Sequence, residues 1–300
     1  MVSPRWIAVD WGTTRLRVWA MGPDGTVAAR CSDKGMGGLS PEQFEGALLD
    51  LIQDWLPATG RLPVIACGMV GARTGWAEAQ YRQTPCPPLD PQAATRPAVR
   101  DPRMDVLILP GLSQADPPDV MRGEETQIAG FLAEHPGFDG TLCLPGTHCK
   151  WARLSGGKVL AFRTFMTGEV FSLLSRQSVL RLSLAEVPPD ASSFALTAAQ
   201  ALADPGLAQT GLFAIRAGSL LNQTGAAENL GRLSGLLIGA ELAACRDLWQ
   251  DRPTVIIGAP QLAALYERAL HDAGALARCE DGGTLALSGL TAAFHELETT

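Results

Sequence analysis

The first third of the chain alternates short apolar runs with turn residues, a pattern typical of β-strands. Strands are predicted at 5–12, 14–21, 26–31, 64–67 and 106–109. Apolar side chains at helical spacing predict a helix over 42–56. Short apolar strands that alternate with helices favour a mixed α/β sheet with crossover connections.

The second half is predicted to be mainly helical. Helices are expected at 167–184, 193–203, 206–224, 227–249 and 260–273, with a buried strand at 254–257. The proline-rich stretch 84–118 predicts turns, and we expect its loops to act as lids over a site.

A strand–turn–strand pattern occurs twice. The first copy runs through Asp10 into the turn at Gly12 and Thr13, and the second runs from a strand over 140–144 into the turn at Gly146 and Thr147. A chance repeat of such a hairpin is much less frequent than a single one. The repeat therefore predicts two similar α/β domains, over 1–135 and 136–300, with an interdomain cleft.

The first of these turns, Asp10-Trp-Gly-Thr-Thr14, carries groups that suit a nucleotide phosphate. Backbone N–H groups at Gly12, with the hydroxyls of Thr13 and Thr14, can cradle an anion. The Asp10 carboxylate can hold Mg²⁺ beside it, directly or through water. Arg17 points away from its apolar neighbours along the strand, so it either reaches phosphate or stays in solvent.

The second turn has a different set of polar groups. Gly146, Thr147 and His148 are predicted to form the second phosphate loop, and Lys150 to add positive charge. Leu144 stands where the first hairpin has Asp10, so no metal carboxylate is expected there.

Charge and cysteine content narrow the class of protein. The formal charge of −7 argues against a nucleic-acid or anionic-membrane partner, and no apolar run reaches the ~20 residues of a membrane helix. Seven scattered cysteines fit reduced thiols in a cytoplasmic protein, and no secretory signal is expected at the N-terminus. No loop of the Gly-x-x-x-x-Gly-Lys-Ser/Thr form occurs, which excludes P-loop kinases.

Taken together, the motifs resemble the 2-dehydro-3-deoxygalactonokinase family of the actin/hexokinase-type ATPase superfamily. The resemblance rests on Ala8–Thr14, Cys67–Arg73 with Trp76 and Tyr81, Arg122–Gln127, Leu144–Trp151, Thr164–Glu169 and Leu233–Glu241. It implies two actin-like ATPase (ribonuclease H-like) domains. It also implies ATP- and Mg²⁺-dependent phosphorylation of 2-dehydro-3-deoxy-D-galactonate at its 6-hydroxyl, giving 2-dehydro-3-deoxy-6-phosphogalactonate in D-galactonate catabolism.

Further residues are candidates for binding and catalysis. Glu124 or Glu125, at the start of a predicted helix, is expected to accept the hydroxyl proton, although acidic residues are common in a first helical turn. Arg73 is expected to bind the sugar-acid carboxylate. Other sugar-acid contacts are predicted at Gly37, Gly68, Met69, Trp76, Tyr81, Thr167 and Glu169, and adenosine contacts at Gly235, Gly258 and Gln261.

Several alternatives stay open. An exopolyphosphatase-type hydrolase would use Glu124 or Glu125 to activate water, and a non-catalytic sugar-acid sensor would bind without turnover. A kinase for 2-dehydro-3-deoxygluconate would differ from a kinase for 2-dehydro-3-deoxygalactonate only in the stereochemistry of its substrate. The sequence also leaves open whether the chain forms a homodimer.

Overall fold

The computed structural model describes residues 3–299, which form two compact units. The first unit contains residues 3–138, 156–161 and 282–299, and the second contains 139–155 and 162–281. The first break lies close to the boundary expected between 135 and 136. Residues 156–161 and 282–299 group with the first unit, whereas the expected division places them in the second.

The first unit is built on a five-stranded sheet in the order β3-β2-β1-β4-β6. Its strands are β1 (Trp6–Trp11), β2 (Leu16–Gly22), β3 (Gly25–Ser32), β4 (Leu62–Gly68) and β6 (Met104–Ile108). β1 runs antiparallel to β2 and parallel to β4, as the strand pattern predicts for a mixed sheet. Burial alternates along β2, with Leu16, Val18 and Ala20 inside.

One face of this sheet is covered by α1 (Phe44–Ile52), which the short 3-10 helix Pro41–Gln43 precedes. The helix places Phe44, Leu48 and Ile52 in the core with Trp11 of β1. Other 3-10 turns span Met36–Gly38, Met69–Gly71 and Pro91–Ala93. The predicted helix over 42–56 is thus confirmed, although it ends earlier.

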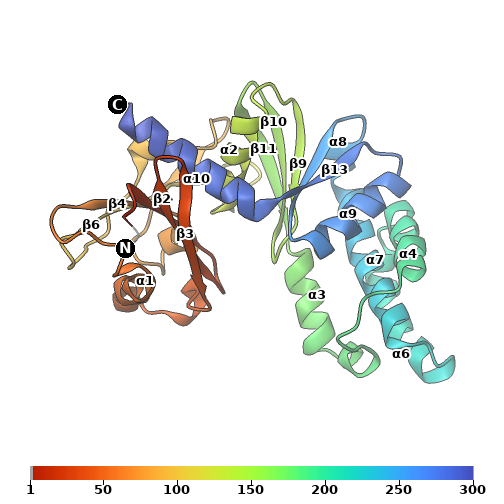
Figure 1. Cartoon of the computed structure of the whole chain (residues 1–300). Coiled ribbons are helices and arrows are strands. Elements are labelled where there is room, and N and C mark those ends of the chain that lie inside the picture. The colour runs from red at the N-terminus through yellow and green to blue at the C-terminus, as the bar shows by residue number, and fades with distance from the viewer. Residues whose placement is uncertain (1–2, 300) are drawn as a thin grey trace. The chain divides into compact units, whose positions relative to one another are not determined.

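Two further helices of the first unit cross at very short range. They are α2 (Glu124–Glu134) and α10 (Gly282–Glu298), the blue helix that ends at the C-terminus in Figure 1. A Cβ at Gly130 would lie 2.0 Å from the Leu285 carbonyl oxygen, and one at Gly289 would lie 1.9 Å from that of Thr126. Only glycine permits this contact, so α10 fixes the position of α2.

The proline-rich stretch 84–118 contains one strand that the sequence pattern does not predict, β7 (Gly111–Gln114). It forms a three-stranded sheet with β5 (Tyr81–Gln83) and β8 (Asp119–Met121), which flank the stretch, in the order β5-β7-β8. β7 pairs with β5, thirty residues earlier in the chain. Sequence periodicity does not report such a distant pairing.

The second unit repeats the arrangement with the sheet order β11-β10-β9-β12-β13. Its strands are β9 (Gly140–Leu144), β10 (Cys149–Ser155), β11 (Lys158–Phe165), β12 (Thr254–Gly258) and β13 (Ala277–Asp281). β9 is antiparallel to β10 and parallel to β12, which matches the pairing of β1 with β2 and β4. The predicted repeat is therefore present in the strand topology.

Helices make up most of the rest of the second unit. They are α3 (Thr167–Arg176), the 3-10 helix Val179–Ser183, α4 (Ala191–Ala203), α5 (Leu207–Thr210), α6 (Leu212–Leu221), α7 (Ala226–Ala244), α8 (Arg246–Trp249) and α9 (Pro260–Asp272). Three of the five predicted helices are each divided into two shorter ones. Among residues 3–299, no helix is long and apolar enough to cross a membrane.

The longest of these helices, α7, packs along α4 (Figure 1). Its glycines 231, 235 and 239 all face α4. A Cβ on Gly235 would lie 2.7 Å from the Phe194 carbonyl oxygen. These glycines are explained by close helix packing.

Candidate active site

The first hairpin places a carboxylate and an arginine side by side. Asp10 lies opposite Arg17 in the antiparallel register of β1 and β2, and the two side chains form an ion pair. The turn is closed by a hydrogen bond from the Gly12 N–H to the Arg15 carbonyl oxygen at 2.9 Å. Thr13 is exposed at the tip. The structure thus gives Arg17 a definite partner at the start of the turn.

The segment after β3 supports this turn from behind. The Gly37 N–H donates to the Thr13 carbonyl oxygen at 2.9 Å, and the Met36 N–H donates to that of Gly12 at 3.0 Å. A Cβ on Gly35 would lie 2.3 Å from the Thr13 carbonyl oxygen. Gly37, predicted as a sugar-acid contact, is therefore explained by its role in holding the hairpin.

The ends of β1 and β4 meet the start of α2 at one edge of the sheet. A Cβ on Gly68, whose φ is +91°, would lie 2.7 Å from the Trp11 carbonyl oxygen, and one on Gly123 would lie 3.3 Å from the Gly68 Cα. Burial raises the pKa of the Cys67 thiol, and the nearby carboxylates of Asp10 and Glu125 raise this pKa further. Asp10 and the two glutamates therefore belong to the same edge.

The two glutamates differ in their surroundings. Glu125 is fully buried, and both of its carboxylate oxygens accept the Gly123 N–H, at 2.9 and 2.7 Å. Burial raises the pKa of Glu125 to about 7, and the neighbouring Glu124 carboxylate adds to this rise. Glu124 is only half-buried, and its carboxylate accepts the Arg122 backbone N–H at 3.1 Å. Glu124 is the more accessible of the two to a substrate.

The loop from Gly68 to Tyr81 contains most of the predicted sugar-acid residues. Arg73 is exposed on this loop, and Met69 is half-buried. Trp76 stacks on Phe44 with ring centroids 6.4 Å apart and packs against the core of the first unit. Trp76 therefore has a packing role in the first unit, and its contact with the sugar acid stays a prediction.

The second hairpin is held in a similar way by α3. The Glu169 N–H donates to the Thr147 carbonyl oxygen at 2.9 Å, and a Cβ on Gly168 would lie 2.1 Å from the Gly146 carbonyl oxygen. The Glu169 side chain is 2.6 Å from Nε2 of His148. Glu169, predicted as a sugar-acid residue, thus lies with the second phosphate loop.

Lys150 occupies the strand position beside this loop. It lies opposite Leu144 in the register of β9 and β10, as Arg17 lies opposite Asp10 in the first unit. The Lys150 side chain is buried, and its Nζ donates to Oγ1 of Thr164 at 2.9 Å. Its positive charge therefore remains inside the second unit, next to the turn.

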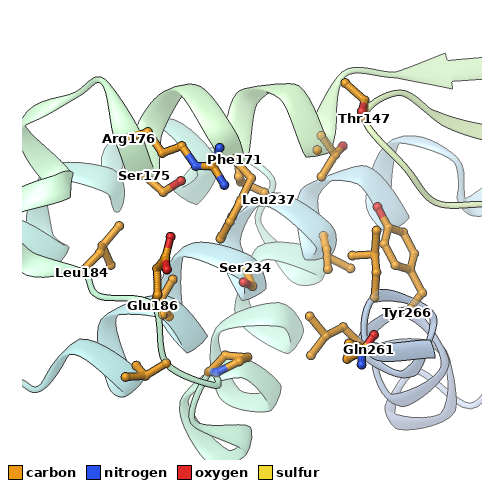
Figure 2. A pocket seen from close by; sticks show the side chains of 18 of the residues that line it. Thr147, Phe171, Ser175, Arg176, Leu184, Glu186, Ser234, Leu237, Gln261 and Tyr266 are labelled. Atoms are coloured by element: carbon orange, nitrogen blue, oxygen red, sulfur yellow. The ribbon is translucent and has the colours of Figure 1, made fainter. Parts of the chain in front are cut away.

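A cavity of about 810 Å³ begins at the second turn. Gly146, Thr147 and Thr167 line it near the turn, and apolar side chains of α3, α7 and α9 form most of its walls. In Figure 2, Thr147, Gln261 and Tyr266 lie at one end of the cavity, and Ser175, Arg176 and Glu186 lie at the other. Its size is within the range of small-molecule sites, about 300–1,000 Å³.

The predicted adenosine residues are only partly brought together. Gln261 lines the cavity, whereas neither Gly235 nor Gly258 belongs to the described lining residues. Gly235 faces α4, and a Cβ on Gly258 would lie 3.2 Å from the Pro145 carbonyl oxygen. Both glycines therefore serve backbone packing. Thr167, predicted to bind the sugar acid, instead lines this cavity.

Two further residues at these places carry no local sequence signal for a role in the site. Tyr266 lines the cavity, and its hydroxyl donates to Oε2 of the buried Glu241 at 2.9 Å. Arg122 is buried, two residues before Glu124. The sequence identifies Arg122 only as part of the Arg122–Gln127 motif. Helical spacing marks Tyr266 as a core residue, and no local signal gives its hydroxyl a role.

Two units with matching five-stranded mixed sheets and flanking helices define the actin-like ATPase class of fold. Solved structures of this fold superpose on the chain. Residues 10–293 match the family model for 2-keto-3-deoxy-galactonokinase. The chain belongs to this family of phosphotransferases.

Individual relatives agree with this assignment. The chain is 41% identical to a probable 2-dehydro-3-deoxygalactonokinase of Rhizobium meliloti (strain 1021), over 97% of this chain and 96% of the relative. It is 33% identical to a 2-dehydro-3-deoxygalactonokinase of Escherichia coli (strain K12), over 98% and 99%. A crystal structure from Sinorhizobium meliloti, provisionally assigned as the same kinase, superposes with a TM-score of 0.89 at 38% identity, covering 97% of this chain and 99% of its own.

Proposed function

We propose that the chain transfers a phosphoryl group from ATP to the 6-hydroxyl of 2-dehydro-3-deoxygalactonate. The observation that carries this proposal is the pair of Gly-Thr hairpins, of which one lies beside Asp10 and Glu124 and the other opens into a large apolar cavity. Phosphoryl transfer depends mainly on positioning and on neutralising charge, and these two sets of groups suit those tasks. Family membership supports the kinase over the hydrolase alternative.

The cavity of the second unit is the proposed site for adenosine. Its apolar walls suit a nucleobase, and the Gly146–Thr147 turn at its mouth suits the phosphates. His148 and Lys150 add donors near that turn, and Gln261 and Tyr266 offer polar groups inside the cavity. These contacts hold the nucleotide in one orientation.

Mg²⁺ fits the first hairpin. One carboxylate oxygen of Asp10 is paired with Arg17. Its second oxygen can coordinate a metal ion or accept a hydrogen bond from a metal-bound water. Mg²⁺ in phosphate sites usually needs one or two carboxylates, because water and phosphate oxygens complete its shell. When bound, the ion would neutralise charge on the phosphate oxygens, while Thr13 and Thr14 bind those oxygens from the turn.

The sugar acid is assigned to the loops of the first unit. Arg73 is proposed to bind the carboxylate from the solvent side. Gly68, Met69 and Tyr81 would then lie close to the remaining carbon atoms of the sugar acid. Glu124 is proposed to accept the proton of the 6-hydroxyl, because it is more accessible than Glu125. Buried Glu125 would hold the start of α2 through its two contacts with the Gly123 N–H.

A coupled assay of ADP release tests the proposal. The purified chain is assayed with ATP and Mg²⁺ against 2-dehydro-3-deoxygalactonate, 2-dehydro-3-deoxygluconate, aldonates and neutral sugars. We expect ADP release with the galacto acid above all others. Phosphate release from ATP or polyphosphate at an equal rate without any sugar acid would instead support the hydrolase.

Compartment and assembly are further proposals. We place the enzyme in the cytoplasm, since its seven cysteines are free thiols and five of them are buried. A homodimer is proposed from exposed apolar residues of α6, among them Phe213, Leu220 and Leu221. Light scattering tests this, and a monomeric mass at micromolar concentration would contradict it.

A further inference from the structure

Arg122 carries a buried positive charge whose donors are not all used. Its side chain lies at the start of α2, and the residue is 8% exposed. Nη2 donates to the Ala79 carbonyl oxygen at 2.7 Å, but Nε and Nη1 have no hydrogen-bond partner within residues 3–299. Buried donors, above all those of a charged group, are destabilising when they are left without acceptors. A ligand with acceptor oxygens would remove this penalty.

The surroundings of Arg122 come from the loop proposed to bind the sugar acid. The guanidinium lies over the Tyr81 ring, with Cζ 4.3 Å from the ring centroid. A Cβ on Gly71 would lie 2.8 Å from Nη1, so glycine is needed there to accommodate the side chain. The ring covers one face of the guanidinium, whereas its N–H groups project within the plane. The stacking therefore leaves the donors at the edges of the plane for an anion.

We propose that Arg122 binds the carboxylate of the sugar acid and is the residue that selects an acid over a neutral sugar. The inference rests on the proposed function, because it needs a carboxylate-bearing acceptor. Arg122 precedes Glu124 by two residues, so the proposed ligand of the carboxylate and the proposed base both belong to the segment where α2 begins.

Burial explains why Arg122 would discriminate more strongly than Arg73. The exposed Arg73 guanidinium is hydrated whether or not an acid is bound, so a neutral analogue loses little there. At Arg122 a neutral analogue leaves a buried charge with its Nε and Nη1 donors still without acceptors among the described residues. Sites of this second kind reject analogues that lack the matching group much more strongly.

The experiment compares three arginines of the first unit. Arg122→Met, Arg122→Lys, Arg73→Met and a control, Arg61→Met at the exposed position before β4, are assayed for kcat and for KM of the acid and of ATP. The second substrate is an analogue in which a hydroxymethyl group replaces the carboxylate. Thermal unfolding of each variant reports whether it remains folded.

We expect Arg122→Met to raise KM for the acid about 10- to 100-fold and to reduce the preference for the acid by a similar factor. KM for ATP should stay unchanged, and Arg122→Lys should recover part of the preference because it keeps the charge. Arg73→Met should raise KM for the acid while most of the preference remains. A folded Arg122→Met variant that keeps the wild-type preference, or that loses affinity for ATP equally, overturns the inference.

Hydrogen exchange gives a readout that needs no turnover. The acid alone should protect residues 69–81 of the wild-type chain, and this protection should weaken in Arg122→Lys. Equal protection in both would overturn the inference, even if Arg122→Met does not fold. If the wild-type chain releases no ADP with the acid, the proposed function fails, whereas Arg122-dependent protection by the acid would still support this binding site.

Discussion

The two hairpins of this chain share a backbone design but differ in the side chains beside it. In each, the carbonyl oxygen of the threonine in the Gly-Thr turn accepts a backbone N–H at 2.9 Å, from Gly37 in the first unit and from Glu169 in the second. In each, a glycine packs against the turn where no Cβ fits, Gly35 in the first and Gly168 in the second. The turns are therefore equally well supported, and their difference lies in the chemistry of their neighbours.

That difference is clearest at one pair of equivalent positions. The first hairpin places Asp10 opposite Arg17, whereas the second places Leu144 opposite Lys150. A carboxylate can hold a metal ion, but a leucine cannot, so only the first hairpin is equipped for metal binding at this position. The second hairpin instead opens into an apolar cavity. We infer from this comparison that the same scaffold serves catalysis in the first unit and nucleotide binding in the second.

The largest expected effect comes from removing the acid of the first hairpin. Asp10→Asn should lower kcat about 1000-fold, because the amide does not replace the carboxylate as a metal ligand. Leu144→Met, at the equivalent position of the second hairpin, keeps the buried volume and should leave kcat within about 3-fold. Both are measured by ADP release at saturating substrates. Near-normal kcat in a folded Asp10→Asn variant would mean that the two hairpins do not differ in metal binding.

The next effect separates the two glutamates of the first unit. Glu124→Gln should lower kcat about 100-fold, since an amide cannot accept the hydroxyl proton. Glu125→Gln should lower it less, because an amide oxygen can still accept the Gly123 N–H. Nucleotide affinity, measured by titration calorimetry, should change in neither variant. The reverse order of the two effects would assign the base to Glu125.

Buried Glu125 also makes a prediction about pH. Its pKa is about 7 in the folded protein against an ordinary pKa of 4.5, so the folded state binds a proton more tightly than the unfolded state. The free energy of unfolding should therefore fall as pH rises from about 4.5 to 7, by a few kcal/mol at most. In Glu125→Gln this fall should be reduced. Urea unfolding at several pH values checks the slope, and parallel curves for the two proteins would contradict the prediction.

Much of the difference between the two hairpins could be predicted from the sequence, because the signals for it are local. Each strand, each Gly-Thr turn and the missing acid at Leu144 is marked by a few neighbouring residues, and the structure confirms the strand repeat. The helix at Ile128 and Phe131 was likewise evident from its apolar spacing. Residues that act through their immediate chain neighbours are therefore the ones that sequence patterns identify.

What the sequence could not give depends on distant contacts. The sequence predicts Gly37 and Trp76 as ligand contacts but does not show their structural roles: Gly37 supports a turn over twenty residues away, and Trp76 packs on Phe44. The return of α10 to the first unit rests on glycines 130 and 289, which are far apart in the chain. The unused donors of Arg122 also depend on distant contacts, because its guanidinium packs against the Tyr81 ring and the Ala79 carbonyl oxygen.

The shared support of the two turns predicts a matched effect. Alanine at Gly35 or at Gly168 would place Cβ 2.3 or 2.1 Å from a backbone carbonyl oxygen, so each turn would have to shift. We expect each variant to lose about 1–3 kcal/mol of stability and about tenfold in kcat/KM. Gly38→Ala, in the same segment as Gly35 but with no atom within 4 Å of a Cβ, is the control. If only one of the two variants differed from this control, the hairpins would not be supported equally.

The smallest effect is expected inside the cavity of the second unit. Tyr266 lines this cavity, and its hydroxyl donates to Glu241, whose other carboxylate oxygen accepts the Nε1–H of Trp151 at 2.7 Å. Tyr266→Phe removes one of these two donors and should cost about 1 kcal/mol of stability. It should raise KM for ATP a few-fold and leave KM for the sugar acid unchanged, because the cavity is assigned to the nucleotide. A rise confined to KM for the sugar acid would reverse the assignment of ligands to the two units, and it would do so even if Asp10 and Glu124 proved essential.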